Sequence, residues 1–275
     1  HKVSSSTSRF EVPLADELDL VRDYLAIEGV RFPDRLRPQD GRSRISIEGR
    51  YVDLRISTVN TRDSEKAVIR ILKPESTKRL EEVGITPREL ARLRQLLNCR
   101  DGIMIVTGPT GSGKTTTMYS AIRELATGDV NISTVEDPVE YELAGITQIQ
   151  VDTKRGVTFA NSLRALLRQD PDIIFIGEIR DAETAGIAAQ AAMTGHLVLA
   201  TLHTNDAMGA VARLADLGLD RQTIATTVRG VLAQRLIRRM CPDCAQPINE
   251  MTEEEQELSQ RYDVTPLSRA VGCKR

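Results

Sequence analysis

Residues 108–115 have the types and spacing of a loop that binds phosphate groups. They match the pattern G-x-x-x-x-G-K-[ST] in full, between an apolar run and a helix-compatible stretch. Glycines let backbone N–H groups turn toward phosphates, Lys114 adds positive charge at the β and γ phosphates, and the Thr115 hydroxyl is a ligand for Mg²⁺. A chance glycine-rich turn is the alternative, but the register of these residues favours binding of a nucleoside triphosphate. The residues expected to contact the nucleotide are Gly108, Pro109, Thr110, Gly111, Ser112, Gly113, Lys114, Thr115 and Thr116.

Acidic residues follow two further apolar runs. Glu136, Asp137 and Glu140 come after one run, and Glu178 comes just after another. In a parallel sheet the carboxyl ends of the strands share one edge, where acids can hold magnesium and orient an attacking water. Either group could be an ordinary solvated turn, but beside a phosphate loop both are candidate catalytic groups. We expect Glu136 and Asp137 to line the nucleotide site.

His196 and His203 flank the apolar run 197–202. Because they stand at opposite ends of one expected strand, joint metal ligation is disfavoured. His203 follows the carboxyl end of the strand and can reach a γ-phosphate. His196 follows Gly195 and could equally end a helix, stabilised by the helix dipole. The positions therefore favour a functional role for His203 over one for His196.

Short apolar runs alternate with helical stretches from residue 102 onward, which is typical of an α/β domain with a mostly parallel sheet. The first helix of this domain is expected at Thr86, where Pro87 and Glu89 complete a capping box. Thr252 and Glu255 predict a second capping box near the carboxyl end. The expected strands are 103–106, 132–135, 173–176 and 197–201, and one helix is expected at 182–193.

A small α+β domain is expected before this one, ending near residue 74. Apolar residues at helical spacing predict a helix over residues 14–26. Residues 1–10 lack periodicity and are expected to be a linker or an expression remnant. Strands are expected at 45–47, 51–57 and 66–72, the first two forming a hairpin with one wet face.

Composition narrows the class of protein. The 275 residues hold 37 Lys and Arg against 39 Asp and Glu, a formal net charge of -2, and 3% of them are aromatic. The chain therefore lacks the basic field and the stacking rings of a dedicated nucleic-acid binder. No run approaches the roughly 20 apolar residues of a membrane span, and the polar amino end is unlike a signal sequence. We expect a cytoplasmic protein with no direct membrane insertion.

Taken together, these residues resemble the secretion ATPase superfamily, specifically the type II secretion and type IV pilus assembly ATPases, over residues 38–275. The resemblance implies that Glu140 orients the attacking water, that Glu178 acts on magnesium, and that His196 and His203 sense the state of the nucleotide. Four boxes stand in the family's order: Walker A at 108–115, the aspartate box at 132–140, Walker B at 168–181 and the histidine box at 194–205.

The resemblance also implies the domain organisation. A RecA-like ATPase domain would occupy residues 86–240, after a partial PAS-like domain at 11–74 and a linker at 75–85. In the family, arginines of the PAS-like domain approach the nucleotide, in some states that of a neighbouring subunit, and the matching positions here are Arg55 and Arg70. Arg55 could simply lie on the polar face of its strand, whereas Arg70 interrupts an apolar run.

Three of the four cysteines, Cys241, Cys244 and Cys273, resemble part of the tetracysteine zinc site of secretion and pilus extension ATPases. A second C-x-x-C would place the fourth ligand at position 276, so we expect a truncated excursion over residues 241–275. Four thiolates make a closed structural site, whereas three leave an open position. Reduced thiols on a flexible excursion are the alternative. The cluster favours an extension or secretion motor, because pilus retraction ATPases generally lack it.

The family's properties imply a Mg²⁺-dependent motor that hydrolyses ATP. Its members form homo-hexameric rings whose rearrangement drives type II secretion or type IV pilus assembly through platform proteins, peripheral to the inner membrane. The alternatives are a non-catalytic, nucleotide-gated ring scaffold and a relative from pilus retraction or type IV secretion. Since the family pattern is not matched before residue 38, the chain is expected to be a fragment that lacks the amino-terminal partner-binding domains.

Overall fold

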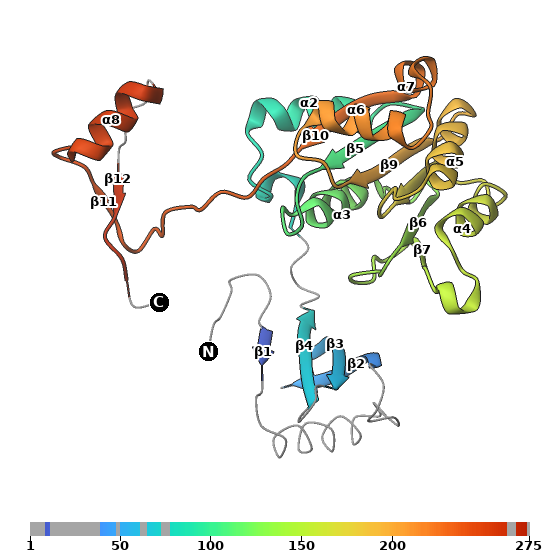
Figure 1. Cartoon of the computed structure of the whole chain (residues 1–275), viewed down its shortest axis with the longest axis horizontal. Helices are drawn as coiled ribbons and strands as arrows, with labels where there is room; N and C mark the ends of the chain where they lie inside the picture. Colours follow the sequence, from blue (N-terminus) through green and yellow to red (C-terminus); the bar gives the residue numbers. More distant parts are fainter. Residues whose placement is uncertain are drawn as a thin grey trace. The chain divides into compact units, whose positions relative to one another are not determined.

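A computed structural model describes residues 9–11, 39–47, 50–60, 65–72, 78–262 and 268–273. The chain divides into two compact units, residues 1–234 and 235–275. Within the described residues, the larger unit holds a four-stranded and a six-stranded sheet, and the smaller unit holds a two-stranded sheet (Figure 1). The helix expected over residues 14–26 lies outside the described residues.

Four antiparallel strands form the first sheet, in the order β1-β4-β3-β2. Leu54, Ile56 and Thr58 are buried, whereas Ser57 and Val59 are exposed, as in a strand with one wet face. The expected hairpin and third strand are confirmed, with longer bounds. The strands are β1 (Arg9–Glu11), β2 (Gln39–Ile47), β3 (Arg50–Asn60) and β4 (Glu65–Leu72).

β1 differs from the expectation that residues 1–10 form a linker or remnant. Arg9 and Phe10 pair with Arg70 and Ile69 of β4. Three residues are too few to show the alternation by which a strand is recognised in a sequence. Pairing with the edge of β4, and not a local pattern, therefore defines β1.

Six parallel strands form the second sheet, in the order β10-β5-β9-β8-β6-β7. The four predicted strands correspond to β5, β6, β8 and β9, and the mostly parallel α/β sheet is confirmed. β7 and β10 were not predicted, because they are partly exposed and lack a continuous apolar run. The bounds are β5 (Gly102–Thr107), β6 (Ile132–Glu136), β7 (Thr147–Gln150), β8 (Ile173–Ile176), β9 (Leu197–Leu202) and β10 (Val228–Ala233).

Helices cover both faces of this sheet (Figure 1). Met104 and Val106 of β5 belong to one core cluster with apolar residues of α2 and α3. Ile103 and Ile105 face the other way, into a cluster with residues of α4, α5, α6 and α7. β5 is therefore buried on both sides, as its apolar sequence requires. The helices are α2 (Pro87–Leu97), α3 (Lys114–Leu125), α4 (Phe159–Leu166), α5 (Ala182–Met193), α6 (Ala207–Asp216) and α7 (Arg221–Thr227), with short 3-10 turns η2 (Leu80–Glu82) and η3 (Thr153–Arg155).

The two predicted helix starts are both found, with one difference. Thr86 caps α2 by accepting from the backbone N–H of Glu89 at 3.4 Å. A full capping box would also have the Glu89 carboxylate accept from the backbone N–H of Thr86. Here that carboxylate accepts from Arg92 at 3.0 Å instead. The box between Thr252 and Glu255 is confirmed in both directions, at 2.8 and 3.3 Å.

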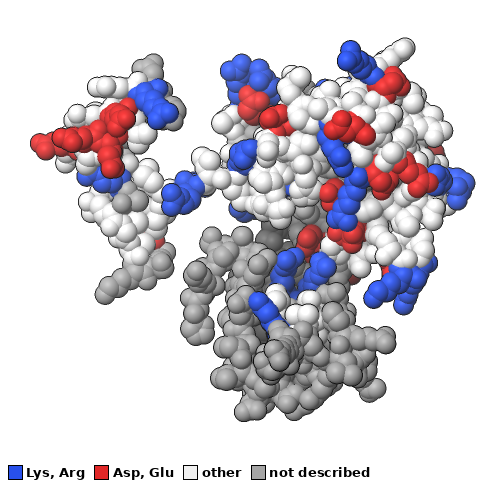
Figure 2. Space-filling model, in the orientation of Figure 1, with Lys and Arg blue, Asp and Glu red and all other residues white. Residues whose placement is uncertain are grey.

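The smaller unit contains an antiparallel pair, β11 (Ala245–Pro247) and β12 (Ser268–Ala270), and the helix α8 (Glu253–Tyr262). The first turn of α8 is acidic, and its side chains form the red cluster in Figure 2. Glu255 of this turn pairs with Arg269 of β12. Over residues 78–234, by contrast, charges of both signs are interspersed on the face shown in Figure 2. None of the helices within the described ranges is long and apolar enough to cross a membrane.

Candidate nucleotide-binding site

The phosphate loop connects the carboxyl end of β5 to the first turn of α3. Gly108, Gly111 and Gly113 have φ angles of 152°, 78° and 87°, which side chains disfavour. A Cβ on Gly108 would lie 2.3 Å from the backbone oxygen of Gln234, so this position accepts only glycine. The hydroxyl of Ser112 is buried and has no hydrogen-bond partner within the described part of the chain. Left-handed glycines, a helix N-terminus and an unsatisfied hydroxyl together fit a bound phosphate group.

Lys114 folds back over this loop. Its Nζ donates to the backbone oxygens of Gly108 at 2.8 Å and Pro109 at 3.2 Å, and lies 3.4 Å from Nδ1 of His203. Burial lowers the pKa of the ammonium, while the negative charge of Glu178 acts in the opposite direction. Phosphate oxygens of a bound nucleotide would replace these two carbonyl oxygens as the partners of the Lys114 ammonium.

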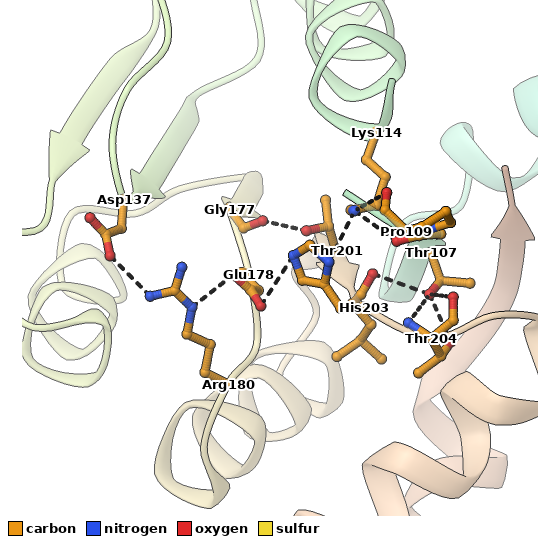
Figure 3. Close-up of polar contacts among 12 residues, drawn as sticks. Thr107, Pro109, Lys114, Asp137, Gly177, Glu178, Arg180, Thr201, His203 and Thr204 are labelled. Atoms are coloured by element: carbon orange, nitrogen blue, oxygen red, sulfur yellow. Dashed lines mark hydrogen bonds and ion pairs between the residues drawn. The ribbon is translucent and has the colours of Figure 1, made fainter. Parts of the chain in front are cut away.

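His203 lies between Lys114 and Glu178, as Figure 3 shows. Its Nε2 is 3.4 Å from Oε1 of Glu178, and its Nδ1 faces the lysine. Because an ammonium can only donate, this geometry favours the tautomer with the proton on Nε2. The structure therefore brings together three predicted site residues, one from the start of α3 and two from the loops that follow β8 and β9.

Thr107, at the end of β5, fixes the backbone on both sides of His203. Its Oγ1 accepts from the N–H of Thr204 at 3.0 Å and lies 3.1 Å from the carbonyl oxygen of Leu202. In the same region Thr201 of β9 donates to the backbone oxygen of Gly177 at 2.5 Å (Figure 3). These contacts tie the ends of β5, β9 and β8 to one another, and so hold His203 and Glu178 at one edge.

Arg180 joins the two acidic loops. Its guanidinium donates to Glu178 at 2.7 Å and to Asp137 at 3.1 Å, as seen in Figure 3. The bond to Glu178 raises the pKa of Arg180. Arg180 therefore bridges Asp137 and Glu178, and Asp137 is connected to the site by this bridge.

Glu136 occupies a different environment from the one expected. It is 2% exposed, and its carboxylate accepts from Thr134 at 2.6 Å, from Gln148 at 3.1 Å and from the Tyr119 hydroxyl. Burial raises the pKa of Glu136, and these three donors act against that shift. With both carboxylate oxygens bonded inside the protein, Glu136 organises the loop after β6, which differs from the nucleotide contact expected from the sequence.

Tyr119 of α3 connects this buried acid to Glu140. The Tyr119 hydroxyl donates to Glu136 and accepts from the backbone N–H of Glu140 at 3.2 Å. Tyr119 is fully buried, and its ring packs edge-on against Tyr141 with centroids 4.5 Å apart. The segment that carries Glu140 is thus held against the helix that follows the phosphate loop.

His196 stands apart from these residues. Its Nδ1 lies 3.0 Å from the carbonyl oxygen of Ala191 and 3.2 Å from the Thr194 hydroxyl, at the end of α5. β9 separates it from His203 by roughly 20 Å, given a strand's rise per residue. Within this chain His196 therefore contacts residues at the end of α5, and its expected role as a sensor of the nucleotide stays a prediction.

Arg55 and Arg70 are direct neighbours across β3 and β4. Both side chains are half-buried. Like charges that face each other across a sheet are unfavourable unless an anion or an acid lies nearby. The pairing therefore makes these two predicted arginines a single cationic feature of the small sheet.

The three cysteines of the smaller unit form a cluster that suits a metal. The sulfur atoms of Cys241, Cys244 and Cys273 lie within 4.8 Å of one another, and those of Cys241 and Cys273 are 3.8 Å apart. Tetrahedral zinc with bonds of about 2.3 Å requires sulfurs about 3.8 Å apart. The donor set and its spacing thus fit zinc.

Arg180, Thr107, Tyr119 and Gln234 contact the site but were not among the predicted site residues. Each of them contacts a partner in another segment of the chain. Tyr119 bonds Glu136, 17 residues away in sequence, and Gln234 bonds Ser112, 122 residues away. Arg180 stands inside the predicted Walker B box, which is the only sequence signal that could have singled out any of the four.

Comparison with known proteins agrees with this geometry. The family model described as "Type II/IV secretion system protein" matches residues 20–275. "Type II secretion system protein HxcR" of Pseudomonas aeruginosa is 57% identical over 208 residues, covering 75% of this chain and 44% of the relative. "Type II secretion system ATPase E" of Vibrio cholerae is 49% identical over 239 residues, covering 86% of this chain and 47% of the relative. The chain thus spans about half the length of the curated relatives it matches.

Solved structures are also similar. The pilus retraction motor PilT with bound ADP has a TM-score of 0.63 and 31% identity, over 83% of this chain and 69% of that one. The ATPase DotB of Legionella pneumophila has a TM-score of 0.62 and 26% identity, over 82% of this chain and 61% of that one. These neighbours support the RecA-like fold class expected from the sequence.

Proposed function

Because the chain belongs to the family of type II/IV secretion system proteins, we propose that it carries the ATP-hydrolysing core of a motor for type II secretion or type IV pilus assembly. The observation that carries the proposal is the line of contacts from Lys114 through His203 to Glu178 at the carboxyl edge of the parallel sheet. It joins the phosphate-binding cation to the acid expected at magnesium. We propose ATP as the nucleotide.

The phosphate loop binds and orients the triphosphate. Its backbone N–H groups, the Ser112 hydroxyl and the α3 N-terminus face the phosphates, and Lys114 exchanges its loop carbonyls for β and γ oxygens. Thr115 and Glu178 would hold Mg²⁺, which neutralises charge that develops on the phosphates. Release of the carbonyls by Lys114 is thus coupled to filling of the site.

Glu140 orients the attacking water and accepts its proton. The residue stands on a segment that Tyr119 and Glu136 hold against α3, so a shift of α3 is passed to the base. Glu178 lies between His203 and Arg180 and contacts both. His203 contacts both the lysine and the acid, and therefore senses whether a γ-phosphate lies between them.

We place this core in a homo-hexamer that acts on platform proteins at the inner membrane, from the cytoplasm. Family membership and the paired Arg55 and Arg70 support this placement, because two facing arginines are stabilised by an anion such as a nucleotide phosphate. In a ring, that anion is the nucleotide of an adjacent subunit. The non-catalytic scaffold remains the competing proposal.

The experiment that separates the motor from the scaffold follows ATP hydrolysis and oligomeric mass together. We expect the rate of phosphate release per chain to rise as hexamers form with increasing protein concentration. In the proposed ring, Arg55 and Arg70 of the adjacent subunit complete each active site. Light scattering gives the mass at each concentration. Hexamers that bind ATP without hydrolysing it would favour the scaffold.

We further propose that Cys241, Cys244 and Cys273 bind a structural Zn²⁺. The chain is expected to retain about one zinc per molecule after gel filtration, and Cys244→Ser to lose it, since three thiolates leave no ligand to spare. Metal content is measured by mass spectrometry, with Cys99→Ser as the control because Cys99 lies outside the cluster. Absence of zinc from the unmodified chain after loading with zinc would reject the site.

A further inference from the structure

Gln234, directly after β10, bonds three parts of the candidate nucleotide site. Its side-chain Nε2 donates to the backbone oxygen of Ser112 at 2.8 Å, and its Oε1 accepts from the Thr117 hydroxyl at 2.8 Å. Its backbone N–H donates to the carbonyl oxygen of Thr107 at 2.8 Å. A single residue thus ties the phosphate loop to α3 and to the end of β5.

The surroundings make these bonds hard to replace. Thr117 is 1% exposed, so its hydroxyl and the amide oxygen that it meets have little access to water. The backbone oxygen of Gln234 also fills the space that a side chain at Gly108 would need. Gln234 therefore meets the phosphate loop at two points. Its backbone oxygen lies beside Gly108, and its side chain bonds the backbone oxygen of Ser112.

We infer that Gln234 is a positioning residue that holds the phosphate loop in the shape that binds a nucleoside polyphosphate. The inference rests on the proposed nucleotide function and extends it to a residue outside every motif in the sequence. A loop with three glycines in the left-handed region has many alternative conformations when it is empty. The two side-chain bonds of Gln234 reduce them, so binding requires less ordering of the loop.

The location of Gln234 adds to this role. It is the last residue of the larger compact unit, and Arg235 begins the unit that carries the cysteines. The covalent connection between the two units therefore starts at the residue that bonds the phosphate loop.

The test measures ADP affinity by calorimetry, with magnesium, on the full chain. Gln234→Met keeps the side-chain length and removes both bonds, and we expect about tenfold weaker binding. Thr117→Val removes only the hydroxyl donor and is expected to weaken binding severalfold, whereas Thr117→Ser keeps the donor and restores affinity. Gln95→Met, at an exposed position of α2, is the matched control and is expected to bind like the parent.

A cycle of the two positions separates positioning from a general loss of stability. If the amide and the hydroxyl act through one bond, the double variant Gln234→Met with Thr117→Val binds ADP no more weakly than Gln234→Met alone. Parental ADP affinity in Gln234→Met would overturn the inference, as would failure of Thr117→Ser to restore the loss seen in Thr117→Val. If Gln234→Met does not fold, the two Thr117 variants decide. If the unmodified chain does not bind ADP, the proposed nucleotide function fails together with this role, whereas parental binding in every variant rejects the role of Gln234 alone.

Discussion

Glu140→Gln is expected to lower the rate of ATP turnover by about 10²- to 10⁴-fold and to leave ADP affinity within about twofold of the parent. Glutamine has the shape of glutamate but cannot take the proton of the attacking water. The substitution leaves the backbone N–H of Glu140, which donates to the Tyr119 hydroxyl at 3.2 Å, in place. Phosphate release by confirmed hexamers gives the turnover, and calorimetry gives the affinity.

Glu142→Gln is the matched control for this prediction. Glu142 lies on the same segment, two residues beyond Glu140, and is exposed. The control is expected to hydrolyse ATP like the parent, because surface charges contribute little at a distance in water. Parental turnover in Glu140→Gln would contradict the assignment and would leave Glu178 and Asp137 as the acids to test next.

Local pattern was sufficient to predict the phosphate loop and the strand that leads into it. The loop's glycines, Lys114 and Thr115 stand within one run of eight residues, and residues 103–106 of β5 are all apolar because helices cover both faces of the strand. The same reasoning placed β8 at the predicted bounds, and α5 likewise. Where one segment contains both the signal and its physical cause, the sequence is enough.

Contacts between distant segments could not be predicted in this way. The sequence around Gln234 contains no sign that its side-chain amide bonds Ser112. That contact exists because β10 lies beside β5 in the folded sheet. Arg180 is a similar case, since its partner Asp137 follows a different strand. These residues are recognised from sheet topology, which a single sequence does not display.

The buried position of Glu136 shows a third limit. The residue follows an apolar run beside Asp137, and its type and place suited a nucleotide contact. Alternation along the chain turns its side chain toward Tyr119 and Gln148 instead, into a network of donors. Glu136, the last residue of β6, and Asp137, which follows it, therefore have different partners, and the direction of each side chain depends on the strand geometry.

Arg70→Ala is expected to lower ATP turnover in confirmed hexamers by about 10³- to 10⁵-fold, the range known for an arginine that neutralises transition-state charge. Arg70→Lys should recover only part of the rate, because an ammonium lacks the planar fork of donors. Arg92→Ala, at an exposed position of α2, is the control and should hydrolyse ATP like the parent. Parental turnover in Arg70→Ala would remove Arg70 from the reaction and leave its cross-strand neighbour Arg55 to be tested in the same way.

Mixing two inactive variants shows whether Arg70 acts on its own subunit or on a neighbour. An Arg70→Ala subunit retains Glu140, and a Glu140→Gln subunit retains Arg70. If the arginine serves the adjacent site, a random mixed ring in equal parts contains about one quarter of sites with both groups, since each ring interface joins two different surfaces. Activity then reappears on mixing and is absent from each variant alone. If Arg70 serves its own subunit, no site in the mixed ring contains both groups, and mixing restores nothing.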